Sequence, residues 1–172
     1  MQKLIWATVA IYVAICITLW GGKVFAAPVE VPFAAGQAKP GTIVVKNSER
    51  RLYLVQRGGK ALRYKVAVGK RGKSWTGKTY ITAKYQKPAW SPPAEVKRDL
   101  PHLPAVIAGG APNNPMGIAA MTLAGGEYAI HGTNRPELIG QSVSYGCIRM
   151  RNEDIADLYR RVGVRTPVIA MN

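Results

Sequence analysis

Short runs rich in β-branched and aromatic residues, separated by turn clusters, dominate the first half of this chain. Residues 42–46 and 51–56 are two such runs, and 47–50 (Asn-Ser-Glu-Arg) lie between them. Residues 62–68 alternate polar with apolar side chains, and 78–84 form a further run. Strand-length segments at this spacing predict hairpins or a meander, so we expect a mainly β fold.

One segment, directly after the second cysteine, predicts a short helix. Asn152 is a favourable N-cap, Glu153 and Asp154 suit a positive first turn, and Gly163 ends the segment. One face is apolar at the spacing i, i+3, i+4 and i+7, with Ile155, Leu158, Tyr159 and Val162. We therefore expect this helix to pack on the sheet, and residues 166–170 to close the domain as a strand.

The first 26 residues have the pattern of a secretory signal peptide. Lys3 supplies a positive start, a long apolar run follows, and small residues stand at the cleavage position. The apolar run is also long enough to remain as an uncleaved membrane anchor. Residues 27–41 are expected to form a linker, and the length of 42–171 suits one domain with its own core.

Beyond the expected signal peptide the chain has a single cysteine, Cys147, because Cys16 lies inside the apolar run. A lone thiol cannot form an internal disulfide, and His131 lies sixteen positions upstream. A fold that brings a thiol and an imidazole together makes a cysteine nucleophile, whereas the alternative is a buried, inert thiol. Two histidines and one cysteine lack the spacing of zinc ligands, so we expect no metal site and no cofactor.

Two segments are predicted to be loops. Residues 69–77 are basic and glycine-rich, but they lack the frame of a phosphate-binding loop and are interpreted as a hairpin connection. Residues 87–115 contain seven prolines, which predicts an extended, irregular excursion. Trp90 in this excursion either packs it against the body of the domain or lines a substrate cleft. His102 is interpreted as a structural or surface residue.

The charge of the chain is one-sided. Twenty-four Lys and Arg residues oppose nine Asp and Glu residues, for a formal net charge of +15. An exported cation suits the carboxylates and phosphates of a bacterial wall, although such a charge also simply keeps a surface solvated. We expect no nucleic-acid partner, because no basic helix or aromatic-interleaved basic patch of the recognised types occurs.

Several short motifs occur in a fixed order around His131 and Cys147. They are Tyr128-Ala-Ile-His131-Gly132-Thr133-Asn134, Ile139-Gly140, Ser144-x-Gly146-Cys147-Ile148-Arg149-Met150-x-Asn152-x-Asp154-Ile155 and Leu158-Tyr159, with 51–55 and 114–117 upstream. This set resembles the L,D-transpeptidase catalytic domain of the YkuD type over about residues 42–171. The resemblance implies a single sandwich-like β domain that cross-links peptidoglycan peptide stems through a thioester.

The resemblance also implies roles for individual residues. Cys147 would attack the carbonyl between the third and fourth residues of a tetrapeptide stem, and His131 would act as general base and then acid. The other imidazole nitrogen has only the backbone oxygen of Gly132 as its neighbouring partner. The amides of Tyr145, Gly146 and Cys147 are candidates for the oxyanion hole.

Substrate binding is assigned to Arg149, Tyr128 and Trp90. Arg149 would lower the pKa of the thiol and pair with a stem carboxylate, whereas its structural alternative is a salt bridge to the Glu153–Asp154 turn. The family pattern is commonly Ser-His-Gly-Cys, and this chain has Tyr145 in place of that histidine. The hydroxyl of Tyr145 both donates and accepts, so it is expected to replace the hydrogen bonding of the missing imidazole.

Alternatives to cross-linking remain open. The same acyl-enzyme could pass its acyl group to water, as an L,D-carboxypeptidase does, or to a lysine of an outer-membrane protein. A wall-binding module with an incidental thiol is the non-catalytic alternative. In every case we expect an exported monomer that acts on peptidoglycan stems in the periplasm or cell wall, either free or tethered by its N-terminal segment.

Overall fold

The computed structural model describes residues 28–34, 36 and 38–172. The expected signal peptide, 1–26, lies outside the described residues. Within the described ranges, no helix is both long enough and apolar enough to cross a membrane.

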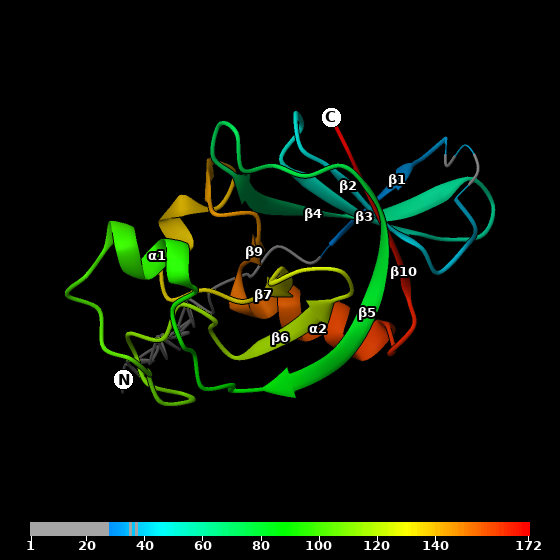
Figure 1. The fold of residues 1–172 in the computed structure, drawn as a ribbon. Coiled ribbons are helices and arrows are strands. Elements are labelled where there is room, and N and C mark those ends of the chain that lie inside the picture. The colour runs from blue at the N-terminus through cyan, green and yellow to red at the C-terminus, as the bar shows by residue number, and fades with distance from the viewer. Residues whose placement is uncertain (1–27, 35, 37) are drawn as a thin grey trace, which may run out of the picture.

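Strands outnumber helices in the described chain, as the sequence predicted (Figure 1). The strands are β1 (Val29–Pro32), β2 (Ile43–Lys46), β3 (Arg51–Val55), β4 (Lys60–Gly69), β5 (Gly77–Gln86), β6 (Ala119–Leu123), β7 (Ala129–His131), β8 (Ser142–Ser144), β9 (Ile148–Met150) and β10 (Pro167–Met171). The helical segments are α1 (Ala94–Asp99), the 3-10 helix η1 (Pro136–Leu138) and α2 (Asn152–Arg161).

The strands form two sheets that share the long strands β4 and β5. The first sheet has the order β1-β4-β3-β2-β10-β5, in which β10 runs parallel to β2 and the other neighbours are antiparallel. The second has the order β5-β6-β7-β9-β4, in which β7 and β9 are parallel. The β5–β6 register shifts between Ile81 and Ala83, and such irregularities bend a strand from one sheet into the next. This arrangement confirms the mainly β, sandwich-like fold.

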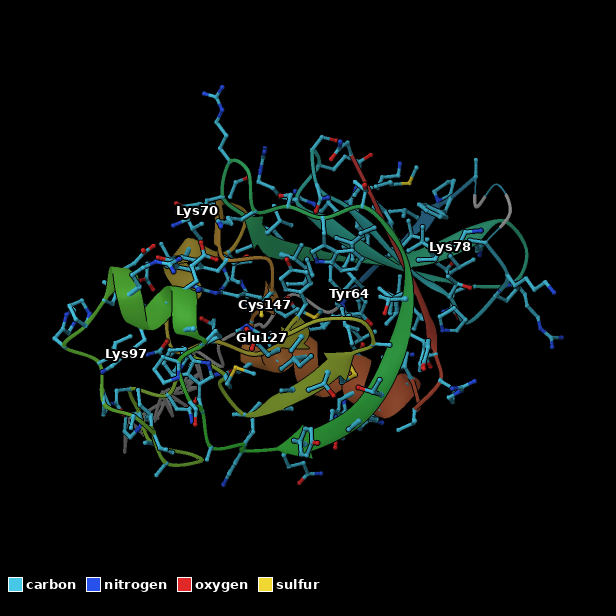
Figure 2. All side chains as sticks on the ribbon, viewed as in Figure 1. Tyr64, Lys70, Lys78, Lys97, Glu127 and Cys147 are labelled. Carbon is cyan, nitrogen blue, oxygen red and sulfur yellow. The ribbon has the colours of Figure 1, made fainter. Side chains whose placement is uncertain are left out.

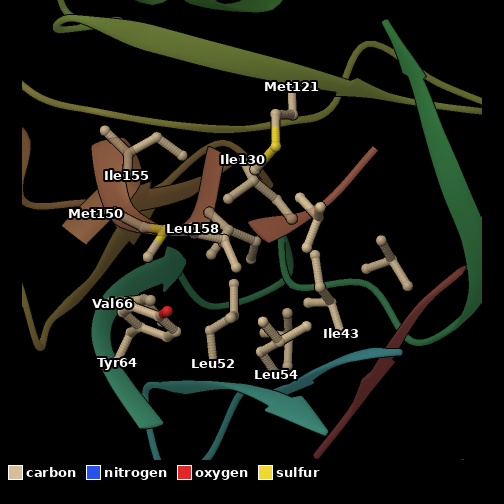
Figure 3. Close-up of a cluster of buried hydrophobic side chains, with 14 of the residues drawn as sticks. Ile43, Leu52, Leu54, Tyr64, Val66, Met121, Ile130, Met150, Ile155 and Leu158 are labelled. Carbon is tan, nitrogen blue, oxygen red and sulfur yellow. The ribbon is translucent and has the colours of Figure 1, made fainter. Parts of the chain in front are cut away.

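Side chains from both sheets and from α2 meet in one apolar core (Figure 3). Side chains alternate between the faces of a strand, so every second residue of β2 and β3 points inward. The core members with the least exposure include Ile43, Val45, Leu52, Val66, Met121, Ile130, Ile148, Met150, Ile155 and Leu158. Full burial of one such side chain stabilises the fold by about 1.5–3 kcal/mol, so this core holds the two sheets together.

Part of the expected linker is a strand. β1 pairs with β4, and Phe33 stacks on Tyr53 with ring centroids 4.7 Å apart. The outer face of β2 and β3 is apolar, and Phe33 covers it in a second buried cluster with Val44, Tyr53 and Val55. The linker expectation for 27–41 was therefore wrong for residues 29–33, because the outer face of the sheet needs an apolar cover that sequence periodicity does not identify.

Helix α2 confirms the predicted helix after Cys147, and its apolar face packs as expected. Ile155 and Leu158 are fully buried. At the C-terminal end, Lys84 Nζ donates to the carbonyls of Tyr159 and Val162 at 2.7 and 2.6 Å. These carbonyls belong to the last turn and lack partners within the helix. The N-cap is Arg151 rather than the expected Asn152.

The proline-rich segment 87–115 is more ordered than the sequence predicted. It contains the short helix α1, and an antiparallel bridge joins Trp90 to Ile107 near its base. The buried side chain of Asn114 donates to the carbonyls of Pro88 and Ala108, both at 2.9 Å. His102 is exposed, as expected. The two ends of the segment are therefore bonded to each other where it departs from the sheet. Between these ends the segment carries α1 to one side of the second sheet (Figure 1).

We expect Leu158→Ala to lower the free energy of unfolding by about 2–5 kcal/mol, because it opens a cavity in the core. Arg160→Ala is the matched control in the same helix, since the Arg160 side chain is exposed. It should change stability by no more than about 0.5 kcal/mol. Denaturant unfolding followed by circular dichroism measures both. Equal losses in the two variants would contradict the assignment of Leu158 to the core.

Candidate active site

A cavity of about 620 Å³ opens between the end of the second sheet and the proline-rich excursion. It brings together the residues that the sequence singled out. Its lining includes His131, Cys147, Arg149, Tyr128, Trp90 and Tyr145. Trp90 therefore lines the cavity and also holds the base of the excursion together, because it forms an antiparallel bridge with Ile107.

The parallel pairing of β7 with β9 places the chemical groups side by side. Ile130 lies opposite Ile148, and His131 lies opposite Arg149. Because successive side chains point to opposite faces, the two isoleucines enter the core while His131 and Arg149 face the cavity. Cys147 directly precedes β9 and lines the same cavity.

The Cys147 side chain is partly buried. Its Sγ lies 4.0 Å from the carbonyl oxygen of Glu127, to which it donates, and Figure 2 labels both residues. Burial raises the pKa of Cys147 above its ordinary value of 9.0. A hydrogen bond from the backbone of Ala129 and the positive charge of Arg149 act to lower this pKa, and the charge of Glu127 acts to raise it. Arg149 thus acts in the expected direction, but burial outweighs it and the thiol stays protonated at neutral pH.

The imidazole of His131 is buried, and the backbone carbonyls of Gly132 and Pro115 lie against it. Its Nδ1 lies 2.7 Å from the carbonyl oxygen of Gly132, which confirms the expected partner. With Nδ1 donating its proton, Nε2 is left as the acceptor. Burial, followed by the positive charge of Arg149, lowers the pKa of His131 to about 4, against the opposing effect of the Gly132 and Pro115 carbonyls. The ring is therefore a neutral base at physiological pH.

The two groups share the cavity as a neutral pair. In the described part of the chain no hydrogen bond joins Cys147 Sγ to His131. Catalytic hydrogen bonds are often long in the free enzyme and shorten when substrate binds. A raised thiol pKa and a lowered imidazole pKa both oppose a preformed thiolate–imidazolium pair. This arrangement suits general-base activation, in which the proton moves as the sulfur attacks.

The turn before Cys147 is held by its own serine. The Ser144 hydroxyl donates to the Cys147 carbonyl at 2.6 Å and accepts from the Gly146 amide at 3.1 Å. The Gly146 amide is thus already paired, which narrows the three oxyanion candidates to the amides of Tyr145 and Cys147. Gly146 has φ of +119°, and a Cβ there would lie 2.3 Å from Tyr128 Cε1, so no other residue fits.

Asn152 has a positioning role that its sequence context concealed. Its Oδ1 accepts from the amide of Thr133 at 3.1 Å and from that of Ile118 at 3.4 Å. A Cβ on Gly132 would lie 2.3 Å from this oxygen. The side chain therefore anchors the segment that follows His131 instead of capping its own helix, and the sequence carried no signal for that contact.

Tyr145 bonds to the proline-rich excursion. Its hydroxyl donates to Asp99 Oδ2 of α1 at 2.6 Å. Lys70 Nζ lies 3.8 Å from the centroid of the Tyr145 ring and 3.6 Å from Asp99 Oδ2. Nearby, Lys73 forms an ion pair with Glu95 of the same helix. Tyr145 therefore attaches α1 to the turn before Cys147.

Arg149 is a half-buried cation without a salt bridge among the described residues, so the alternative pairing with the Glu153–Asp154 turn is not formed. Its Nε is buried without a hydrogen-bond partner. A buried donor left unpaired is costly, and the cavity that Arg149 lines is open to a ligand. The guanidinium is thus available to pair with an anionic group of a ligand.

Comparison with known proteins gives a consistent picture. The profile of the YkuD family, described as an L,D-transpeptidase catalytic domain, matches residues 40–169. The chain is 40% identical over 135 residues to the probable L,D-transpeptidase YbiS of Escherichia coli K12, covering 73% of this chain and 43% of that protein. It is also 40% identical over 134 residues to the probable L,D-transpeptidase ErfK/SrfK of Salmonella typhimurium, covering 73% of this chain and 42% of that protein. It therefore spans less than half the length of these relatives.

Solved structures share the fold at low sequence identity. The L,D-transpeptidase from Mycobacterium smegmatis aligns with a TM-score of 0.60 at 17% identity, covering 76% of this chain and 58% of that one. The catalytic domain of the E. faecium L,D-transpeptidase aligns with a TM-score of 0.60 at 19% identity, covering 79% of this chain and 100% of that one.

We expect Cys147 to be alkylated by iodoacetamide at a rate that rises through pH 9 without a plateau near neutrality, because the thiolate is the nucleophile and burial raises the pKa of the thiol. A Cys16→Ser background restricts the reaction to Cys147. The measurement is the alkylation rate against pH by intact mass.

Two variants test the charges around the thiol. Arg149→Met should raise the midpoint of this profile, and Glu127→Gln should lower it, because the two charges act on the thiolate in opposite directions. A rate plateau near neutral pH, or shifts of the same sign in both variants, would contradict the neutral pair.

Proposed function

Because this chain belongs to the YkuD family of L,D-transpeptidase catalytic domains, we propose that it cross-links peptidoglycan stems through an acyl-enzyme on Cys147. The observation that carries the proposal is the shared cavity. It presents one thiol, one neutral imidazole whose Nδ1 is held by the Gly132 carbonyl, and one cation without a salt bridge among the described residues. A wall-binding module would need none of these three groups in this arrangement.

In the first half-reaction, Cys147 Sγ attacks the carbonyl between the third and fourth residues of a tetrapeptide stem, while His131 Nε2 takes the thiol proton. The negative charge that develops on the carbonyl oxygen is stabilised by the amides of Tyr145 and Cys147. The C–N bond then breaks, His131 returns the proton to the departing amine, and D-alanine leaves. The product is a thioester on Cys147.

In the second half-reaction, the side-chain amine of diaminopimelate on another stem attacks the thioester. His131 takes a proton from the attacking amine, the C–S bond breaks, and the proton passes to the departing sulfur. A new amide joins the two stems, and the enzyme regains its neutral pair. The same residue serves as base and acid in both halves, for which the neutral His131 is suited.

Arg149 is proposed to bind the donor stem. Its guanidinium lines the same cavity as the thiol, and a bidentate carboxylate would satisfy the buried Nε that the protein leaves unpaired. Tyr128 and Trp90 line the same cavity and would supply apolar walls for the stem. Charge at the base of the cavity and aromatic sides together favour an extended, carboxylate-bearing peptide.

Glu127 favours an amine as the acyl acceptor over water. Its exposed carboxylate lines the cavity, and it forms no salt bridge among the described residues. A carboxylate beside the thiol attracts a protonated amine to the thioester, whereas water gains nothing from it. This feature supports cross-linking, and it would serve a protein lysine equally well. It offers no advantage to a carboxypeptidase.

The remaining expectations also enter as proposals. An exported enzyme that reaches the wall in the periplasm, as a monomer, agrees with the high positive charge of the chain. Whether the enzyme is free or tethered depends on cleavage of residues 1–26.

Incubation with a disaccharide-tetrapeptide should give an acyl adduct on Cys147, free D-alanine and a dimeric muropeptide, all read by mass spectrometry. Cys147→Ala should abolish all three products. His131→Ala should slow acylation by about 10²–10⁴-fold, the usual loss when a general base is removed. A fully active Cys147→Ala protein, or the absence of any adduct on the parent enzyme, would refute the mechanism.

Glu127→Gln should shift the fate of the acyl-enzyme from dimer toward tripeptide, because the amine loses its counter-charge while water does not. The measurement is the ratio of dimer to tripeptide, which does not depend on how fast the acyl-enzyme forms. Glu30→Gln is the matched control, since it removes the same charge from β1, where Glu30 pairs with Lys60. An unchanged ratio of dimer to tripeptide in Glu127→Gln would contradict the proposed role of Glu127 in binding the acceptor amine.

A further inference from the structure

The peptide unit between Gly146 and Cys147 carries one of the two amides assigned to the oxyanion hole. Its carbonyl oxygen belongs to Gly146 and its N–H to Cys147. In a planar trans peptide these two groups point in opposite directions, so whatever holds the carbonyl also orients the N–H. The group that holds this carbonyl comes from a distant part of the chain.

The indole of Trp75 holds that carbonyl. Trp75 Nε1 donates to the Gly146 oxygen at 3.0 Å, across 71 positions of sequence. The indole also stacks on Tyr128, with ring centroids 5.9 Å apart and an interplanar angle of 4°. The Tyr128 ring in turn contacts the position where a Gly146 side chain would stand. Trp75 thus restrains the peptide both directly and through Tyr128.

The segment that carries Trp75 is itself anchored on both sides. The Asn47 side chain donates to the Trp75 carbonyl at 2.9 Å. The Lys70 amide donates to the Ser144 carbonyl at 2.8 Å, and the Ser74 hydroxyl donates to the Gly69 carbonyl at 3.0 Å. The basic, glycine-rich connection 69–77 is therefore bonded to the turn that precedes the nucleophile, and it is more than a mobile hairpin loop.

We propose that Trp75 is a positioning residue for acyl transfer, which aims and polarises the Cys147 N–H toward the oxyanion. Trp75 is not among the residues that line the cavity, so it acts through the peptide and not on the substrate. A hydrogen bond accepted by the carbonyl of a peptide unit also makes the N–H of the same unit a stronger donor, because linked hydrogen bonds polarise one another. The proposal rests on the proposed function for its biological reaction, but the oxyanion forms with any acyl donor.

The test compares two reactions of the same thiol in a Cys16→Ser background. Attack on p-nitrophenyl acetate creates an oxyanion, whereas alkylation by iodoacetamide creates none. Trp75→Phe keeps an aromatic ring against Tyr128 but removes the indole donor. We expect its acylation rate to fall by about 10- to 100-fold, somewhat less than the loss of a whole oxyanion donor, while its alkylation rate stays within about twofold of the parent.

Asn47→Ala is the second variant, because it loosens the Trp75 backbone and leaves the indole in place. It should lower the ratio of acylation to alkylation in the same direction by a smaller factor. If both rates fall together in the two variants, Trp75 is only a structural residue and the proposal is overturned. Unchanged acylation in Trp75→Phe overturns it as well.

The outcome is separable from that of the proposed function. Failure of the parent enzyme to form an adduct with the disaccharide-tetrapeptide would refute the proposed reaction with peptidoglycan stems. The ratio measured with p-nitrophenyl acetate would still report on Trp75, because that donor does not depend on recognition of a stem.

Discussion

The parallel pairing of β7 with β9 is the constraint on which the site depends. It places His131 level with Arg149, while the residues beside them, Ile130 and Ile148, are buried in the core. The same pairing therefore stabilises the domain and sets the spacing of the groups at the candidate site. A shift of one residue in register would exchange the faces and bury the wrong side chains. The positions of His131 and Arg149 at the cavity therefore depend on the apolar packing of Ile130 and Ile148.

Burial decides the protonation states at the site. Desolvation is the largest effect on both Cys147 and His131, and it opposes the charged form of each. Arg149 acts against that effect on the thiol but reinforces it on the imidazole. The result is a neutral pair, and in the proposed mechanism it separates charge only as substrate reacts, when the amides proposed for the oxyanion hole stabilise the developing charge.

Two excursions from the sheets converge on the turn before Cys147. From one side, the connection 69–77 brings Trp75 to the Gly146 carbonyl. From the other, the proline-rich segment brings Asp99 to the hydroxyl of Tyr145. The tyrosine that stands where the family commonly has histidine therefore links α1 to the turn, away from His131. The departure from the family pattern thus has a structural use in this chain, because Tyr145 bonds to Asp99.

The sequence alone determined the strand runs and the helix after Cys147, and it singled out Cys147 and His131, which line one cavity, because periodicity and side-chain chemistry are local properties. It also indicated the Gly132 carbonyl, which is adjacent to His131. Only the tertiary structure decided the partners of Trp75 and Asn152, and the cover that Phe33 provides for the outer face of the sheet. Those contacts join segments far apart in sequence, and each depends on which groups the packed sheets leave within hydrogen-bonding or stacking distance.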